Sequence, residues 1–221
     1  MIPTYNPARM RNLEPLIRSI LNCTFVDKLI VSNNNPEVRI CERVRVRDPR
    51  LTLLDQPTRR GPGYSWVLAD GEQGEYFLSI DDDVLLYPEQ VARLFEHLVK
   101  RPGVPHGLAG VCGSKYVSCQ EQEVDNLYVV YAVTRAQVRR YLEYARRIVQ
   151  AGLASQDDVE LWSDDILLSR TGSSRPVIHD TGFLLQALTC YHPQIALHKQ
   201  QEFEARRQRV ADALETVLRA E

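Results

Sequence analysis

The stretch Tyr76-Phe77-Leu78-Ser79-Ile80-Asp81-Asp82-Asp83-Val84-Leu85-Leu86 places three consecutive carboxylates between two apolar runs. The first run has the length and composition of a buried strand, so the carboxylates fall at its carboxyl end, where open α/β sheets bind their ligands. Carboxylates this close raise one another's pKa unless a cation joins them, and their oxygens suit Mg²⁺ or Mn²⁺. The stretch therefore predicts a divalent-cation site. The alternative is a solvated acidic turn in which Asp83 caps a short helix.

Strand and helix patterns alternate through the first half of the chain and become more mixed in the second. Apolar spacing predicts strands over 28–31, 51–54, 76–80, 108–111, 127–133 and 176–178. It predicts helices over 9–21, 65–69, 88–100, 134–150 and 164–170, and from 201 to the end. This order favours one α/β domain with a mostly parallel central sheet and helices on both faces. Within it we expect residues 1–110 to bind a nucleotide and residues 111–221 to shape a second substrate pocket.

Composition narrows the class of protein. The 27 basic and 29 acidic residues are interspersed, with a net charge of -2, so the chain lacks the basic footprint of a nucleic-acid binder. The five cysteines are scattered without a CxxC pair, which favours buried thiols in a reducing compartment, although one disulfide stays open. No signal peptide or membrane-spanning run is evident.

Three further segments form an ordered set with the acidic triplet: Ile2-Pro3-Thr4-Tyr5-Asn6, Lys28-Leu29-Ile30-Val31-Ser32-Asn33-Asn34-Asn35-Pro36 and Ser163-Asp164-Asp165-Ile166-Leu167-Leu168-Ser169. Over roughly the whole chain, this set resembles the nucleotide-sugar-dependent glycosyltransferases of the GT-A fold. The first segment and the triplet resemble the inverting, family-2-like enzymes, whereas the other two lean towards the retaining, exostosin-like group. The resemblance implies transfer of a hexosyl or N-acetylhexosaminyl group from a nucleoside diphosphate, most simply a UDP-sugar, to a hydroxyl of a saccharide or other acceptor.

Five residues outside the acidic triplet are candidates for binding the donor. Thr4 and Tyr5 end the first strand, where a nucleobase could lodge on the Tyr5 ring; core packing is the other interpretation. Asn33 ends the second strand and could pair with a pyrimidine edge, or serve turn chemistry. Arg59 and Arg60 stand beside a flexible Gly61-Pro62-Gly63 loop and could fork onto diphosphate oxygens, or be solvated.

The resemblance implies a role for each acid of the triplet. Asp83 is expected to bind Mn²⁺ or Mg²⁺, with Asp81 as a further ligand, and Asp81 and Asp82 to contact ribose and sugar. The ion would stabilise the leaving diphosphate as a Lewis acid. His198, which precedes Arg206-Arg207, is a looser candidate for contact with the metal or diphosphate, because its spacing departs from the exostosin-like pattern.

Asp164 and Asp165 match the late acidic pair of these enzymes, with Asp165 at the position of the catalytic carboxylate. An inverting enzyme would use Asp165 as a base and a retaining one as nucleophile or stabiliser. Alternatively, both acids sit at a helix N-terminus because the helix dipole favours them there. The usual Glu-Asp is Asp-Asp here, which leaves the role of Asp164 less defined. His179 could also face the site.

Two rival functions remain. A nucleotidyltransferase would normally carry a Gly-rich basic loop after its first strand, where this chain has Pro7-Ala8-Arg9-Met10. A non-catalytic module that binds a nucleotide sugar or metal would share every binding motif. We expect a cytoplasmic protein; a Golgi-lumenal catalytic domain of a longer protein is the alternative, because the chain starts abruptly within a strand.

Overall fold

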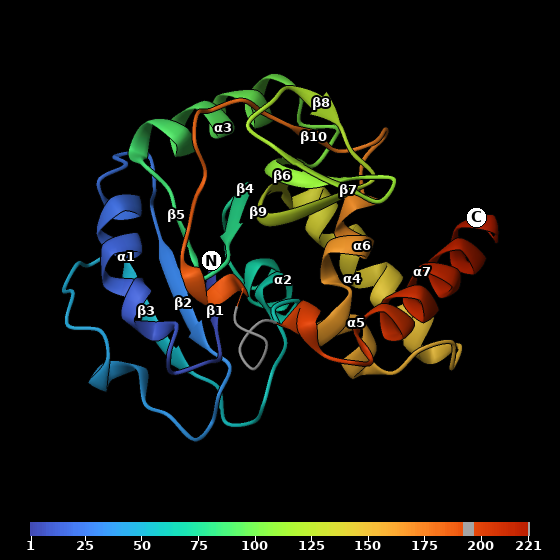
Figure 1. The fold of residues 1–221 in the computed structure, drawn as a ribbon, viewed down its shortest axis with the longest axis horizontal. Helices are drawn as coiled ribbons and strands as arrows, with labels where there is room; N and C mark the ends of the chain where they lie inside the picture. The colour runs from blue at the N-terminus through green and yellow to red at the C-terminus, as the bar shows by residue number, and fades with distance from the viewer. Residues whose placement is uncertain (192–196, 221) are drawn as a thin grey trace.

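The computed structural model describes residues 1–191 and 197–220 and has an α/β architecture (Figure 1). Its N-terminal sheet is parallel, with strand order β1-β2-β3. These strands are β1 (Ile2–Thr4), β2 (Leu29–Asn33) and β3 (Leu51–Asp55). The next strand is β4 (Tyr76–Ile80), which lies beside β1: the Met1 amino group donates to the Leu78 carbonyl at 2.6 Å, and the Ile80 amide donates to the Met1 carbonyl at 3.0 Å. The four carboxyl ends are therefore brought to one edge.

A second, mixed sheet continues from β4 in the order β4-β9-β6-β10-β8, with β7 beside β6. Its strands are β6 (His106–Cys112), β7 (Lys115–Ser118), β8 (Gln122–Glu123), β9 (Asn126–Thr134) and β10 (Val177–Ile178). The long strand β9 is antiparallel to both β4 and β6. The expected mostly parallel sheet thus describes the first half of the molecule, and the second half departs from it.

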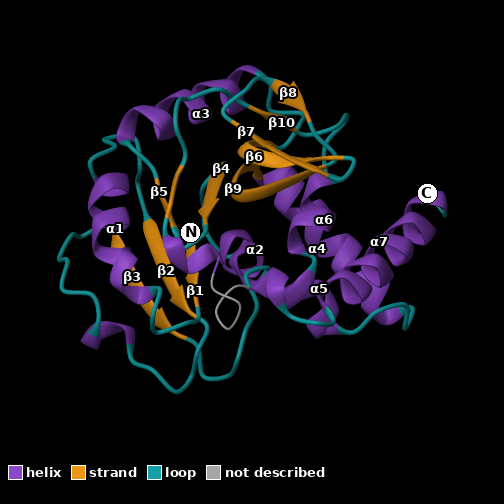
Figure 2. Cartoon of the chain, in the orientation of Figure 1, coloured by secondary structure: helices purple, strands orange, loops and turns teal. Residues whose placement is uncertain are grey.

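Helices cover both faces of the strands, as the sequence predicts (Figure 2). They are α1 (Leu13–Leu21), α2 (Tyr64–Asp70), α3 (Pro88–Lys100), α4 (Arg135–Gln150), α5 (Gln156–Trp162), α6 (Asp164–Ser169) and α7 (Phe203–Arg219). Helices α1 and α3 pack into one apolar core and α2, α4, α6 and α7 into another. Alternate residues of β9 face the two: Val130 and Ala132 the first, Tyr131 and Val133 the second.

Several elements form where local sequence chemistry places them. Helix α3 begins at Pro88, which suits the first helical turn because its missing N–H is not needed there. Helix α4 begins after a capping box in which Gln137 Oε1 accepts from the Thr134 amide at 2.8 Å. The predicted helix over 9–21 starts instead as a 3-10 turn, Met10–Asn12, and becomes α-helical at Leu13. That turn aims Arg9 and Asn12 at the acidic triplet.

Four short strands were not evident from the sequence: β7, β8, and two that pair with each other. The strand β5 (Val84–Leu85), directly after the acids, pairs antiparallel with β11 (Leu185–Gln186). The next amide along, that of Ala187, donates to the Asp83 carbonyl at 2.7 Å. The segment between β10 and β11 therefore returns to the triplet from the C-terminal part of the chain.

Candidate active site

The acidic triplet lies at the carboxyl end of β4, and the first residues of the chain hold its middle member. The Thr4 hydroxyl donates to Asp82 Oδ2 at 2.6 Å, and the Asn12 side-chain amide donates to the Asp82 carbonyl at 3.1 Å. Thr4, expected to touch the donor, is 3% exposed and instead orients Asp82. The residue at the end of β1 thus contributes to the site by holding Asp82 in position.

Arg9 is a site residue that the sequence analysis did not identify. Its guanidinium reaches Asp82 Oδ1 at 3.2 Å and Asp83 Oδ2 at 3.0 Å, bridging the two carboxylates. The available signal was its position as the first cation after the β1 strand. Pairing with Arg9 offsets part of the cost of burying Asp82 and Asp83, each of which is 4% exposed.

Negative charge nevertheless exceeds the positive charge around the triplet. Burial raises the pKa of Asp81 well above its usual range, and repulsion from Asp83, Asp164 and Asp82 adds to this. Burial also raises the pKa of Asp82 to about 6, against the opposing effect of Arg9. Asp83 Oδ1 is buried and has no hydrogen-bond partner. Asp81 and Asp164 form no ion pair with any residue that the structure describes. This arrangement of oxygens fits a divalent cation.

The late acidic pair begins α6, and its two members have different surroundings. Asp164 is 9% exposed and its pKa is raised to about 8, because burial and then the neighbouring Asp165 disfavour its charged form. Asp165 forms a bidentate ion pair with Arg207 of α7, with Nη1 to Oδ1 at 2.6 Å and Nη2 to Oδ2 at 2.7 Å. Burial therefore favours the protonated form of Asp164, whereas both oxygens of Asp165 are paired with Arg207.

Aromatic rings surround the Asp165–Arg207 pair. The Arg207 guanidinium lies 4.9 Å from the Phe203 ring centre and 5.6 Å from that of Tyr128, whose hydroxyl accepts from Nη2 at 3.2 Å. Arg206 lies over the Trp162 ring at 5.2 Å. Trp162 is 8% exposed and its carbonyl accepts from Arg207 Nη1, so its ring belongs largely to the packing around Arg207. Such flat apolar faces beside a carboxylate are suited to a sugar ring.

The two arginines proposed to bind the diphosphate, Arg59 and Arg60, have different surroundings. Arg59 lies 5.3 Å from the centre of the Tyr5 ring, which is 42% exposed, so both groups present an accessible face near the end of β1. Arg60 stacks on Tyr64 at 4.3 Å and pairs with Glu160 at 3.5 Å. The geometry leaves Arg59 and Tyr5 accessible to a ligand and uses Arg60 to fasten its loop to α5.

Asn33, whose amide was expected to pair with a nucleobase, is completely buried. Its Nδ2 group donates to the Val38 carbonyl at 2.6 Å and to Asp55 Oδ1 at 2.7 Å, and its Oδ1 accepts from the Asn35 amide at 3.1 Å. Since both N–H groups are already bonded, Asn33 holds the loop after β2 against the end of β3. These contacts are of the kind that the turn-chemistry alternative describes.

The Gly61-Pro62-Gly63 segment, expected from the sequence to be a flexible loop, is held by hydrogen bonds to neighbouring elements. The Gly61 amide donates to Glu160 Oε1 at 2.9 Å and its carbonyl accepts from Asn34 Nδ2 at 2.9 Å. The Gly63 amide donates to the Glu160 carbonyl at 3.0 Å. A Cβ at Gly61 would lie 2.3 Å from that carbonyl oxygen. Glycine is needed here for close packing against α5.

Replacing Gly61 by Ala is expected to lower the free energy of unfolding by about 1–3 kcal/mol, since backbone must move to admit the methyl group. The control is Gly71→Ala, where the nearest atom to an added Cβ is 3.4 Å away. That variant should be neutral or more stable by up to about 1 kcal/mol, because alanine restricts the unfolded chain. Urea denaturation of both variants measures the difference. Equal free energies of unfolding for the two variants would contradict the close packing of Gly61 against α5.

His198 and His179 lie in different places. His198 is in the short 3-10 turn Leu197–Lys199; burial and then Lys199 lower its pKa, and Asp83 and Arg9 are close enough to act on it. It approaches the triplet from the C-terminal side but forms no group of three ligand atoms with Asp81 and Asp83. The ring nitrogens of His179 contact His106 and Glu121.

A cavity of about 470 Å³ lies elsewhere, beside β1, β2 and β4, with Phe25, Tyr76, Phe95 and Leu98 in its lining. It touches neither the acidic triplet nor the Asp164–Asp165 pair. The polar chemistry is therefore at the carboxyl edge of the strands, and we assign the site from the carboxylates. No helix of the described residues has the length and apolar character needed to cross a bilayer.

Two solved structures are similar to this chain in fold. The structure of S. aureus TarS 1–349 is similar over 97% of this chain and 69% of its own, at a TM-score of 0.54 and 13% identity. GalNAc-T7, solved with UDP, GalNAc and Mn²⁺, is similar over 84% of this chain and 42% of its own, at a TM-score of 0.58 and 7% identity. At such identities the likeness shows the fold alone.

The sequence comparisons identify the family. No curated protein matches the chain. The family described as glycosyl transferase family 2 matches residues 1–148, about two thirds of the 221 residues. The match includes the triplet, whereas Asp164, Asp165 and Arg207 lie beyond it. The chain therefore belongs to glycosyl transferase family 2 and has the GT-A fold.

Proposed function

We propose that this glycosyltransferase transfers a hexosyl or N-acetylhexosaminyl group from a UDP-sugar to an acceptor hydroxyl, with Mn²⁺ or Mg²⁺ as cofactor. The observation that carries the proposal is the buried cluster of Asp81, Asp82 and Asp83, with Asp164 close to Asp81, in which Arg9 pairs with Asp82 and Asp83 but not with Asp81 or Asp164. Ionised carboxylates in this number need a further cation. A UDP- and Mn²⁺-containing neighbour of the same fold supports the choice of donor and ion.

Asp83 and Asp81 are the residues that we assign to the cation. Asp83 Oδ1 is buried without a partner, and the raised pKa of Asp81 reflects a position in which its charge is not balanced. A divalent ion held there would neutralise charge on the departing diphosphate. Asp82 is bonded to Thr4 and Arg9, so it gives the triplet its shape and offers its remaining lone pairs to ribose. His198 stays a candidate for diphosphate contact from the C-terminal side.

Asp165 is the residue that we assign as general base. Membership of family 2 favours the inverting route of the two left open by the sequence. A base must be ionised and must keep its position before the acceptor arrives. Arg207 meets both needs, since two charge-assisted hydrogen bonds hold the Asp165 carboxylate. Asp164, protonated at neutral pH and close to Asp81, is better suited to donate a hydrogen bond to the donor sugar.

Arg59→Gln is expected to weaken UDP-sugar binding by about 10-fold or more, because a charge-assisted hydrogen bond to phosphate contributes about 1.5–3 kcal/mol. Arg60→Gln is the matched control. Its guanidinium is already engaged by Tyr64 and Glu160, so donor affinity should change little. Calorimetric titration in Mn²⁺ compares the two. Unchanged binding by the Arg59 variant would remove Arg59 from the donor site.

The proposed activity is tested by release of nucleoside diphosphate from a panel of UDP-, GDP- and other nucleotide sugars, with Mn²⁺ and then with EDTA. We expect release from a UDP-sugar that EDTA abolishes. Release unaffected by EDTA would refute the metal requirement. Donor binding without release, even when saccharide acceptors are added, would indicate a non-catalytic binding module.

A further inference from the structure

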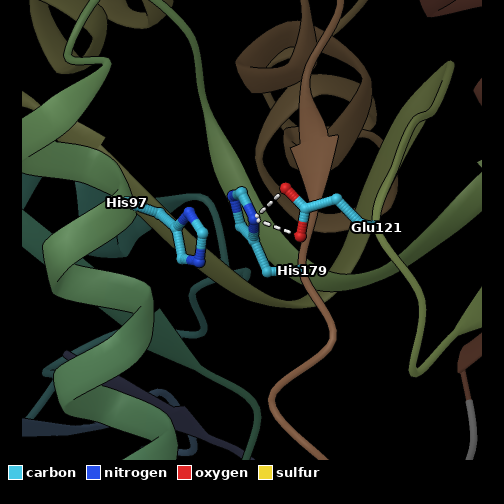
Figure 3. Close-up of side chains that lie close together, drawn as sticks. All are labelled: His97, Glu121 and His179. Atoms are coloured by element: carbon cyan, nitrogen blue, oxygen red, sulfur yellow. Dashed lines mark hydrogen bonds and ion pairs between the residues drawn. The ribbon is translucent and has the colours of Figure 1, made fainter.

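A second group of metal-ligating side chains lies outside the acidic site (Figure 3). It contains His97 from the last turn of α3, Glu121 from the turn before β8, and His179 directly after β10. One ligand atom from each lies within 4.8 Å of the other two. Figure 3 shows the His179 ring between His97 and Glu121, with both carboxylate oxygens of Glu121 directed at it.

A fourth residue, His106 of β6, fixes how His179 presents its nitrogens. His106 is 1% exposed, and its Nε2 lies 2.8 Å from the Arg101 carbonyl oxygen. A carbonyl only accepts, so this nitrogen carries the hydrogen, and the other nitrogen of the neutral ring is an acceptor. His106 Nδ1 lies 2.7 Å from His179 Nε2, which must therefore donate. In a neutral His179 the remaining nitrogen, Nδ1, has a lone pair.

That lone pair faces an anion. His179 Nδ1 lies 2.9 Å and 3.0 Å from the two Glu121 carboxylate oxygens. A lone pair and a carboxylate repel each other unless positive charge lies between them, and His179 itself is 3% exposed. The arrangement resembles metal-binding histidines generally, whose second ring nitrogen donates to an acceptor that fixes the ring.

We propose that His97, Glu121 and His179 bind a transition-metal ion of the Zn²⁺ class, at a site separate from the Mn²⁺ or Mg²⁺ of the acidic triplet. Two imidazoles and one carboxylate are a ligand set suited to Zn²⁺, whereas the triplet offers only oxygen. The fourth position is left to water. His106 orients His179 without binding the ion.

Small movements of two side chains, Glu121 and His97, would bring the three ligands into place around the ion. Tetrahedral Zn²⁺ separates a nitrogen and an oxygen ligand by about 3.3 Å, so Glu121 has to retreat by a few tenths of an ångström, which its 59% exposed side chain allows. The His97 ring stacks on His179 at 3.7 Å and 18°. An ion in the plane of His179 is out of the plane of His97, so His97, half-buried near a helix end, must turn its ring towards the ion.

The ion would secure the first residue of the segment that returns to the active site. From His179 the chain runs through Gly182, which has φ of +96°, to the Phe183 carbonyl, which accepts from Gln90 Nε2 at 3.1 Å. It then forms β11 and reaches the Asp83 carbonyl through the Ala187 amide. A Zn²⁺ ion at His179 is thus a structural element supporting the backbone of Asp83.

Cobalt titration of the EDTA-treated, desalted protein tests the proposal, since Co²⁺ reports nitrogen ligation and low coordination number by visible absorption. We expect one equivalent of Co²⁺ to give this absorption and Zn²⁺ to displace it. Glu121→Gln and His97→Asn should each weaken binding by about 10-fold or more. Glu123→Gln, a nearby exposed acid on β8, and Asp83→Asn should leave the absorption unchanged.

Three outcomes would overturn the proposal. Absence of visible absorption at saturating Co²⁺ would exclude the ligand set. Absorption lost in Asp83→Asn but kept in Glu121→Gln would place the ion at the acidic triplet. The third outcome is a melting temperature that does not change when Zn²⁺ is added and that Glu121→Gln lowers by the same amount with and without chelator. It would mean that a proton on His179 occupies the position that we assign to the metal.

Discussion

Asp165→Asn is expected to reduce the turnover number by about 10²- to 10⁴-fold while donor affinity stays within about 3-fold, because the change removes the base but not the donor site. The side chain keeps its shape, and Thr4, Arg9 and the triplet are untouched. The measurements are the rate of sugar transfer at saturating substrates and calorimetric binding of the UDP-sugar in Mn²⁺. If Asp165 is the base, its loss slows the chemical step alone, so turnover should fall while donor affinity is kept.

Asp164→Asn is the matched control, and its smaller expected effect follows from its protonation. The pKa of Asp164 is raised to about 8, so below that pH the residue is mostly the neutral acid, which asparagine imitates. Turnover near pH 7 should therefore fall far less than in Asp165→Asn. If Asp164→Asn abolishes turnover and Asp165→Asn preserves it, the base is Asp164.

Stability must be measured beside these rates, because Asp165→Asn leaves Arg207 buried without its charge partner. Loss of one member of a buried ion pair commonly destabilises a protein by about 3–5 kcal/mol. The double variant Asp165→Asn with Arg207→Gln removes both charges. We expect it to recover part of the lost stability and to stay inactive. Recovery of turnover in the double variant would show that the unpaired Arg207, and not loss of the base, had stopped catalysis.

Asp83→Asn is expected to weaken Mn²⁺-dependent donor binding by about 100-fold or more, because it removes a negatively charged oxygen ligand from the cation site. Asp83 is the acid of the triplet with a buried oxygen that has no partner, and its other oxygen pairs with Arg9. Donor binding measured with Mn²⁺ and with EDTA should differ strongly in the original protein and little in the variant.

The control for this substitution is Asp157→Asn, an exposed acid in the first turn of α5. It makes the same change in net charge and should leave metal-dependent binding unaltered. If Asp83→Asn binds donor with the same Mn²⁺ dependence as the original protein, Asp83 is not a metal ligand. The site would then have to be rebuilt around Asp81 and Asp164.

Local patterns in the sequence predicted the elements that position the site. The acidic triplet follows an apolar run that indeed forms β4, and the capping pair Thr134 and Gln137 starts α4 where expected. These features depend on neighbours within a few residues, and so the chain reveals them directly. The family resemblance added the fold, which the comparisons confirm.

The contacts that define the site were beyond such patterns because they join distant residues. Arg207 reaches Asp165 across 42 positions, and Thr4 reaches Asp82 across 78. Asn33 looks like an available amide until the fold supplies Asp55 as its partner. Gly61 looks like a flexible hinge until α5 is packed against it. In each case burial, which a sequence does not state, decides between binding a ligand and supporting the fold.

The central strand β9 has a consequence for how the molecule folds. One of its faces belongs to the core under α1 and α3, and the other to the core under α4 and α7. Neither core can form without ordering this strand, and ordering it favours both. The N-terminal and C-terminal halves of the chain are therefore coupled into one cooperative folding unit, in which a destabilising change in either core also destabilises the other.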